Sequence, residues 1–273
     1  MRGVESTPNN KEKSLRIFTL RLFCYNIPMT DKHKISKDGH IVRPKHMSPA
    51  EIREGCEYKA NGDVTETKIC EINEEFRQGF NVLLNHGKHE KSVTFWGSAR
   101  TPEGSEYYEK ARRLGNRIGE LGYTVVTGGG PGIMEGGNRG AFEAGAHSIG
   151  ATIDLPFEQE TNPYVTEEIP FYYFFSRKVI LGFSAEAYLY FPGGFGTFDE
   201  LFEMLTLIQT KKIPSLPIIL VGKEFWQPFV DLLKKQMLDN FETISPEDLD
   251  LFKVLDDEDE IIEIIKNAPQ RDE

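Results

Sequence analysis

The sequence predicts an α/β fold, in which a doubly wound parallel sheet carries helices on both faces and follows an N-terminal extension. The first reason is that short β-type runs alternate with segments of helical spacing from residue 92 onward. The second is that two of these runs lead directly into glycine-dense turns, at 128–140 and 192–196. With 273 residues, the chain is long enough for one large domain and an extension. We expect the extension to cover residues 1–70 and the domain to cover residues 71–268.

The strands and helices of this fold are expected at regular intervals along the chain. Apolar runs predict strands at 92–97, 123–127, 147–153, 170–175, 187–191 and 217–221. Helical spacing predicts helices at 70–86, 107–121, 176–185, 201–208, 225–237 and around 261–265. The acidic run 256–260 is expected to begin the last helix, where negative charge is favourable. The polar segment 155–170 is expected to form a rim or lid over the sheet edge.

The extension shows no sustained helical or strand periodicity, and residues 1–14 are expected to be partly disordered. A helix is expected to begin near Ser48-Pro49-Ala50-Glu51. His33, His40 and His46 match no compact metal site, and we interpret them as solvated loop residues. The three cysteines, Cys24, Cys56 and Cys70, are an odd and widely spaced set, which predicts neither a disulfide framework nor a zinc site.

The excess of acidic residues restricts the kinds of molecule that the protein is expected to bind. There are 32 Lys and Arg residues against 43 Asp and Glu residues, a net charge of -11, which argues against binding of nucleic acid or of acidic membrane surfaces. No apolar run approaches the roughly 20 residues that span a bilayer, and the apolar segment 17–27 lacks a clear cleavage pattern. We therefore expect a small-molecule ligand and a cytoplasmic location.

The most informative stretch is Phe191-Pro-Gly-Gly-Phe-Gly-Thr-Phe-Asp-Glu200, which predicts a strand end, a glycine turn and a helix start. Glycines at 193, 194 and 196 allow a ligand close to the main chain. A helix that begins there directs unpaired N–H groups and partial positive charge at the ligand. The turn is therefore expected to bind an anion such as a phosphate.

Three further loops are expected at the same carboxyl edge of the sheet. They are Gly97-Ser98-Ala99-Arg100, the glycine turn at 128–137, and Arg177-Lys178. The turn at 128–137 lacks the Lys-Ser/Thr ending of a P-loop and does not match G-x-G-x-x-G in register. Two guanidinium groups, one ammonium group and two glycine-rich helix starts together suit a phosphorylated ligand.

Each of these residues also has a structural interpretation. Thr197-x-x-Glu200 has the spacing of a capping box, in which both side chains would satisfy helix N–H groups. The functional alternative is that Glu200 activates water or holds a sugar hydroxyl, as carboxylates do in cleavage of ribosyl bonds. Arg177 could be an ion pair at a helix start. Arg100 and Lys178 could be surface charges, and Met134 and Phe195 could line a base pocket or pack into the core.

Taken together, residues 92–240 resemble the Lonely Guy (LOG) family of nucleotide-binding proteins, often misnamed lysine decarboxylases. The resemblance rests on Pro192-Gly-Gly-x-Gly-Thr-x-x-Glu200, on glycines 128–130 with Gly132 and Met134, and on Arg177-Lys178. Three motifs resemble the branch with longer N-terminal extensions: Gly-Ser-Ala-Arg100, Glu158-Gln-x-x-x-Asn162-Pro-Tyr and Phe202-Glu-x-x-Thr206.

The resemblance implies a Rossmann-like homodimer or higher homo-oligomer that hydrolyses the N-glycosidic bond of a nucleoside 5′-monophosphate. AMP and cytokinin riboside monophosphates are the implied substrates, with no cofactor and no metal. Carried over by motif, Arg177 and Glu200 would be catalytic. The residues expected to bind the nucleotide are Ser98, Arg100, Gly129, Gly130, Met134, Glu158, Lys178, Gly193, Gly194, Gly196, Thr197 and Thr206. The alternative is a non-hydrolytic protein that binds or carries a nucleotide or a phosphorylated cofactor such as a pterin.

Overall fold

A computed structural model describes residues 46–86, 91–155 and 160–270 of the chain. The predictions for residues 1–14, His33, His40, Cys24 and Glu158 lie outside these described residues. Within them, no helix combines the length and the apolar character needed to cross a bilayer.

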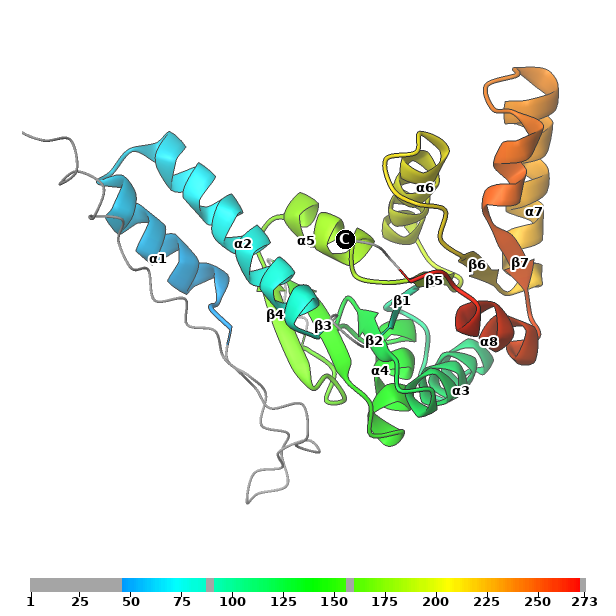
Figure 1. Ribbon diagram of the computed structural model, residues 1–273, viewed down its shortest axis with the longest axis horizontal. Coiled ribbons are helices and arrows are strands. Elements are labelled where there is room, and N and C mark those ends of the chain that lie inside the picture. The colour runs from blue at the N-terminus through cyan, green and yellow to red at the C-terminus, as the bar shows by residue number, and fades with distance from the viewer. Residues whose placement is uncertain (1–45, 87–90, 156–159, 271–273) are drawn as a thin grey trace, which may run out of the picture. The chain divides into compact units, whose positions relative to one another are not determined.

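The centre of the fold is a seven-stranded parallel sheet in the order β4-β3-β2-β1-β5-β6-β7 (Figure 1). Its strands are β1 (Ser92–Trp96), β2 (Thr124–Thr127), β3 (Ser148–Ile153), β4 (Glu167–Phe171), β5 (Ala187–Tyr190), β6 (Ile218–Val221) and β7 (Lys253–Leu255). The strand order reverses between β1 and β5. In such sheets ligands bind outside the carboxyl ends of the strands at this reversal, so the loops after β1 and β5 occupy the expected position of a site.

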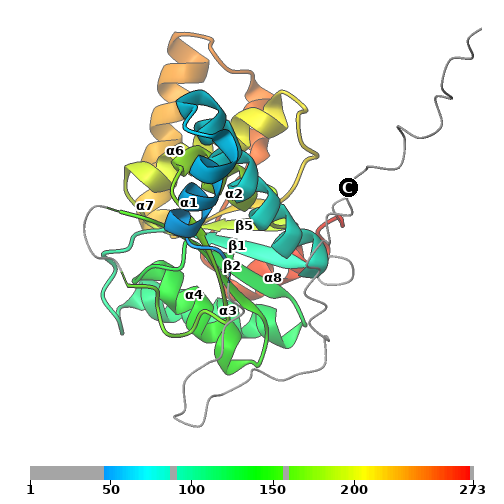
Figure 2. The same ribbon diagram turned by 90° about the vertical axis from the view of Figure 1, so that its left-hand side faces the viewer.

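Helices cover both faces of the sheet, which confirms the predicted α/β class (Figures 1 and 2). One face packs against α3 (Glu106–Glu120), α4 (Ile133–Glu143) and α8 (Glu258–Lys266). The other packs against α2 (Val64–His86), α5 (Phe174–Gly182), α6 (Phe195–Gln209) and α7 (Lys223–Leu233), which continues as a π-helix, Lys234–Asn240. The short 3-10 helix Pro246–Leu251 precedes β7.

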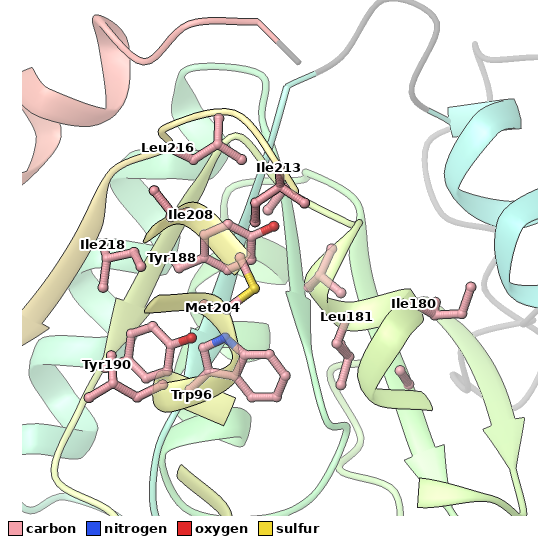
Figure 3. Close-up of a cluster of buried hydrophobic side chains, with 14 of the residues drawn as sticks. Trp96, Ile180, Leu181, Tyr188, Tyr190, Met204, Ile208, Ile213, Leu216 and Ile218 are labelled. Carbon is pink, nitrogen blue, oxygen red and sulfur yellow. The ribbon is translucent and has the colours of Figure 1, made fainter. Parts of the chain in front are cut away.

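Alternation along β1 shows how the sheet supplies both cores. Val93 and Phe95 point into the core beneath α3 and α4, whereas Trp96 points into the opposite core. Figure 3 shows that second core, where Trp96 lies beside Tyr190 and Met204 of α6 approaches from the helix layer. Trp96 and Tyr190 stack with ring centroids 6.1 Å apart. The strands that carry the candidate site are therefore fixed from both sides.

Most of the predicted strands are confirmed, but the strand predicted at 170–175 is wrong. The strand at this position is β4, Glu167–Phe171, and α5 already begins at Phe174. Consequently, the end of the segment predicted as a rim, 155–170, is itself an edge strand. Pro170 is compatible with that position because an edge strand leaves one side unpaired. The three-residue strand β7, at the other edge, was not predicted.

Ahead of the sheet, α1 (Pro49–Ala60) and α2 form a helical hairpin. Helix α1 begins at the predicted position, where Ser48 and Glu51 form a complete capping box. The chain then turns at Asn61 and Gly62, whose φ angles are 50° and 84°. Helix α2 starts at Val64, so the expected boundary at residue 70 lies inside it; the division into extension and domain stays a prediction.

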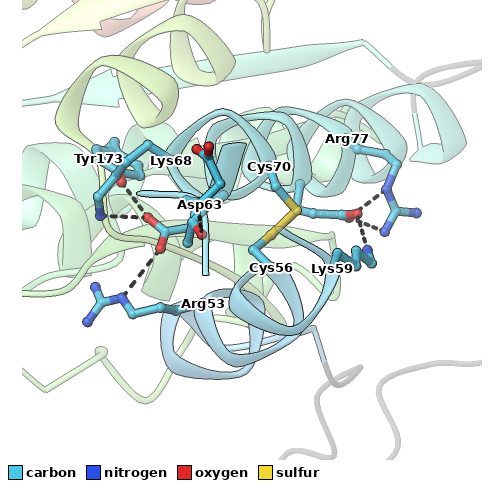
Figure 4. Close-up of a disulfide and its surroundings, with 11 residues drawn as sticks. Arg53, Cys56, Lys59, Asp63, Lys68, Cys70, Arg77 and Tyr173 are labelled. Atoms are coloured by element: carbon cyan, nitrogen blue, oxygen red, sulfur yellow. Dashed lines mark hydrogen bonds and ion pairs between the residues drawn. A yellow bond between two sulfur atoms is a disulfide. The ribbon is translucent and has the colours of Figure 1, made fainter. Parts of the chain in front are cut away.

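The hairpin carries a disulfide between Cys56 and Cys70, so the prediction that the cysteines form no disulfide framework is wrong for these two residues (Figure 4). They are 14 residues apart in sequence, and the turn at Asn61 and Gly62 brings their Cα atoms to 5.6 Å. Closing a loop of this length removes entropy from the unfolded chain and stabilises the fold by about 3 kcal/mol. The pairing depends on helix packing, which cysteine spacing alone does not reveal.

The prediction of a solvated loop histidine is also wrong for His46. Its Nε2 atom lies 2.8 Å from Oε1 of Glu167 in β4, and its side chain is only 19% exposed. The segment that precedes α1 is thereby tied to the edge of the sheet.

Candidate active site

Three of the predicted loops meet at the carboxyl edge through backbone hydrogen bonds. Ser98, after β1, donates its N–H to the Pro192 carbonyl after β5 at 3.1 Å. The Ser98 carbonyl accepts the N–H of Ile133, the first residue of α4, also at 3.1 Å. Gly132 makes this approach possible, because a Cβ there would lie 2.4 Å from the Ser98 oxygen. Ser98 therefore joins the loops on both sides of the strand-order reversal.

The glycine turn after β2 is held by a buried polar residue that the sequence did not single out for the site. Asn162 donates its side-chain amide to the carbonyls of Gly129 and Gly130, at 3.1 and 3.0 Å. Its main-chain N–H also donates to the Gly129 carbonyl at 2.9 Å. From the other side, the Thr127 hydroxyl accepts the N–H of Gly129 at 2.8 Å. These hydrogen bonds hold the main chain of the glycine turn in one conformation.

Arg177 reaches this turn from α5. Its Nε donates to the carbonyl of Ala151 in β3 at 2.7 Å, and its side chain is only 13% exposed. A Cβ on Gly128 would lie 2.2 Å from Arg177 Nη2, so the guanidinium occupies space that only glycine leaves open. Burial lowers the pKa of Arg177, and the charge of Glu200 opposes that shift. The guanidinium is thus fixed across the ends of β2 and β3.

Glu200 faces Arg177 from the first turns of α6. Oε1 of Glu200 lies 4.0 Å from Arg177 Nη1, and the Glu200 side chain is 15% exposed. Burial raises the pKa of Glu200 to about 8, although the charge of Arg177 acts in the opposite direction. A carboxyl group with a pKa near neutrality is suited to exchange protons during a reaction. The hydroxyl of Tyr190 donates to the Glu200 carbonyl at 3.2 Å and holds this turn of the helix.

The capping-box interpretation of Thr197 and Glu200 is wrong. Helix α6 begins at Phe195 with Gly194 as its N-cap, and that N-cap makes no side-chain hydrogen bond. Thr197 is therefore the third residue of the helix, and its buried side chain packs against Gly193, where a Cβ would lie 2.1 Å from Oγ1. The Glu200 side chain is left available for chemistry.

The surface of this turn is open. Gly194 and Gly196 are exposed, and apart from their chain neighbours and the backbone of the same helix, no described atom lies within 4 Å of the Cβ position of either. Phe195 between them is 97% exposed, so the interpretation that it packs into the core is wrong. Met134 is half-buried, and its sulfur would lie 2.8 Å from a Cβ on Gly128, beside Arg177.

Lys178 follows Arg177 on α5, and its charge also lowers the pKa of Glu200. Lys178 contacts carboxylates of α6, with Nζ 2.6 Å from Asp199 Oδ2 and 3.7 Å from Glu203 Oε2. Burial lowers the pKa of Lys178, but these carboxylates outweigh burial and raise it overall. Its charge is thus largely balanced within the protein.

Arg100 and Thr206 are both exposed. The N–H of Arg100 donates to the Ser98 hydroxyl at 3.0 Å, which shapes the loop without using the guanidinium. Thr206 donates its hydroxyl to the Phe202 carbonyl of its own helix at 2.7 Å. It lies six residues after Glu200, about 9 Å along α6 at the helical rise per residue, and its hydroxyl is engaged within its own helix.

Comparisons with known proteins agree with this fold. The fold and the position of the site define a Rossmann-like α/β protein with its candidate site at the reversal of strand order. A family described as "possible lysine decarboxylase" matches residues 134–265. The structure of the molybdenum cofactor carrier protein from Chlamydomonas reinhardtii superimposes with a TM-score of 0.50 at 23% identity, covering 66% of this chain and 98% of that one. That likeness supports the fold alone.

Two curated relatives carry more specific names. The chain is 33% identical over 149 residues to the pyrimidine/purine nucleotide 5′-monophosphate nucleosidase of Escherichia coli K12, covering 51% of this chain and 32% of that protein. It is 30% identical over 150 residues to the cytokinin riboside 5′-monophosphate phosphoribohydrolase LOG of Oryza sativa subsp. japonica, covering 54% of this chain and 61% of that protein. The matches thus span about a third and three fifths of these relatives. They confirm the resemblance to the LOG family that the motifs predicted.

Proposed function

We propose that the protein hydrolyses the N-glycosidic bond of a nucleoside 5′-monophosphate, such as AMP or a cytokinin riboside monophosphate, to the free base and ribose 5-phosphate. The observation that carries the proposal is the buried pair of Arg177 and Glu200 beside an uncapped glycine-rich helix start. The names of the relatives support the reaction class, since both act on nucleoside 5′-monophosphates by name.

The phosphate of the substrate is proposed to lie at the start of α6. Gly194 and Gly196 present main chain without side-chain cover, and the helix start directs partial positive charge outward. The N–H groups of the first turn are suited to phosphate oxygens. Gly193 contributes differently, because it makes room for the Thr197 side chain that supports the turn.

Glu200 is proposed to act on the ribose and on water. As the C1′–N bond breaks, positive charge develops on the sugar ring, and an ionised carboxylate stabilises it. Water adds its oxygen to C1′ and gives up a proton, while the departing base keeps the bonding electron pair and takes up a proton. With a pKa of about 8, Glu200 is suited to receive and release that proton.

Arg177 is proposed to set the electrostatics of this step. It keeps part of the Glu200 population ionised, because a positive charge 4.0 Å away opposes the effect of burial. Its contacts with Ala151 and Gly128 hold it in one position, so it requires little reorganisation during the reaction.

The test is a product assay with AMP, GMP, CMP and isopentenyladenosine monophosphate, in which base and ribose 5-phosphate are separated by chromatography. We expect base release by the wild-type protein and a loss of about 10²- to 10⁴-fold in Glu200→Gln. Asp231→Asn, in α7 and hydrogen-bonded to Gln227 at 2.9 Å, is the matched control. Nucleotide binding without product from any of the four would reject hydrolysis and support the carrier alternative.

A homodimer and a cytoplasmic location also remain proposals. Light scattering after gel filtration tests the first, and cell fractionation tests the second. The disulfide Cys56–Cys70 bears on the location, since stable disulfides are rare in a reducing cytosol.

A further inference from the structure

Helix α5, which carries Arg177, begins without a side-chain cap from its own sequence, in a partly exposed aromatic segment where Tyr172, Phe174 and Phe175 are 42%, 61% and 48% exposed. Its N-cap, Tyr173, makes no side-chain capping bond, and its first turn contains no acidic residue. Ser176, in that turn, is fully buried. The first N–H groups of a helix have no partners within the helix, so acceptors from elsewhere in the protein stabilise this start.

Glu75 of α2 supplies these acceptors. The N–H of Tyr172 donates to Glu75 Oε1 at 2.7 Å, and the N–H of Tyr173 donates to Oε2 at 3.4 Å. The hydroxyl of Ser176 also donates to Oε2. Glu75 is 1% exposed, so these contacts are shielded from water. Its carboxylate lies at the positive end of the α5 dipole, where negative charge is favourable.

These contacts lead directly to Arg177. The Tyr173 carbonyl accepts the N–H of Arg177 at 3.2 Å and the hydroxyl of Ser176 at 2.9 Å. Glu75 therefore holds both the residue that receives the Arg177 N–H and the residue next to Arg177. In addition, Glu71 of α2 accepts the Tyr173 hydroxyl at 2.5 Å (Figure 4).

Helix α2 is itself well supported for this role. A Cβ on Gly79 would lie 2.5 Å from Cγ1 of Ile180, so the absence of a side chain lets α2 approach α5 closely. Phe80 and Phe183 form an edge contact with centroids 6.0 Å apart. The disulfide joins α2 to α1 one residue before Glu71. A rigid α2 can hold the start of α5 in one place.

We propose that Glu75 is a positioning residue. From α2, its carboxylate accepts the hydrogen bonds at the start of α5 and thereby sets the position of Arg177 in the candidate site. The relevance to catalysis rests on the proposed nucleosidase activity, but the placement of α5 does not. A helix outside the segments matched to the known family would thus contribute to the geometry of the site.

The experiment compares Glu75→Gln with Glu74→Gln, its neighbour on α2, which pairs instead with Lys59 and Arg77. Glutamine keeps the shape of Glu75 but loses the charge and one acceptor. Hydrogen exchange of peptides covering residues 172–178 is measured in the wild-type protein and both variants, together with kcat and KM for AMP. If Glu75→Gln does not fold, Ser176→Ala replaces it, since that change removes only the hydroxyl link.

We expect exchange at 172–178 to be about tenfold faster in Glu75→Gln, because charged hydrogen bonds are lost, and unchanged in Glu74→Gln. We also expect kcat to fall about 10- to 100-fold, as a displaced catalytic group implies, with KM less affected. Exchange equal to that of the wild-type protein, or kcat equal to that of Glu74→Gln, would overturn the proposal. Absence of wild-type turnover would reject the proposed function, while exchange would still decide the role of Glu75.

Discussion

Four helices that start at the carboxyl edge of the sheet, α4 to α7, fall into two kinds. Helices α5 and α7 are closed by carboxylates from distant parts of the chain: Glu75 bonds the start of α5, and Asp256 accepts the N–H of Lys223 at 3.1 Å at the start of α7. Helices α4 and α6 have glycine N-caps, Gly132 and Gly194, neither of which makes a side-chain capping bond. Of these four helices, α4 and α6 lack carboxylate caps, and the glycine start of α6 is the one proposed for the anionic ligand.

The largest effect is expected from converting an open start into a closed one. Gly194 has extended backbone angles, with φ -94° and ψ -159°, and open space at its Cβ position, so Gly194→Asp should fold and cap α6. The new carboxylate would compete with phosphate, and we expect KM for AMP to rise about 100-fold, since a charge-assisted contact is replaced by repulsion. Gly194→Asn, which caps without charge, is the control. An equal KM in the two variants would contradict the assignment of phosphate to this turn.

A smaller effect is expected in the glycine turn between β2 and α4. Gly128→Ala would force Arg177 Nη2 and Met134 Sδ to move, since a Cβ would lie 2.2 and 2.8 Å from them. Both are flexible side chains, so the fold should survive while the guanidinium is displaced. We expect kcat to fall about tenfold or more, measured alongside the melting temperature. A loss of folding with no specific change in kcat would show that Gly128 serves packing instead.

The smallest effect is expected at a closed start. Asp256→Ala removes the acceptor for the Lys223 N–H, and loss of such a cap costs about 1 kcal/mol of unfolding free energy. Urea denaturation measures this change. Because α7 lies outside the cluster of Arg177 and Glu200, base release should be unchanged. A large loss of activity would contradict the view that the carboxylate cap of α7 serves stability alone.

Features that depend on neighbouring residues in the sequence could be predicted. Strands at 92–97 and 187–191 and the meeting of their loops followed from local patterns and from the rule for parallel sheets. The role of Glu200 could not be decided from the sequence, because Thr197-x-x-Glu200 has the spacing of a capping box. The structure decides it, since α6 begins at Phe195 and Thr197 is not the N-cap.

Long-range pairings could not be predicted. Glu75 and Ser176 are 101 residues apart, and the Cys56–Cys70 disulfide depends on how α1 turns into α2. Asn162 supports the turn at Gly129 and Gly130 from 33 and 32 residues away. Such contacts arise from tertiary packing, which neither periodicity nor spacing encodes.

The raised pKa of Glu200 also predicts how stability depends on pH. Its folded-state pKa of about 8 exceeds the ordinary glutamate value of 4.5, so the folded state binds more protons than the unfolded state between these values. Its contribution to stability is full below pH 4.5 and is lost as pH rises through 8. We expect the melting temperature of Glu200→Gln, relative to the wild-type protein, to increase from pH 5 to pH 9.

The most direct test of the central claim, that Glu200 acts as an ionised carboxylate in hydrolysis, is the pH dependence of kcat/KM for AMP. The account predicts that kcat/KM rises with pH and levels off around the Glu200 pKa of about 8, because the free enzyme must ionise this residue. In Glu200→Gln, most of the activity should be lost, and the remaining kcat/KM should no longer rise with pH around 8. A rise centred near 4.5, the ordinary glutamate value, or a limb that persists in Glu200→Gln, would contradict it.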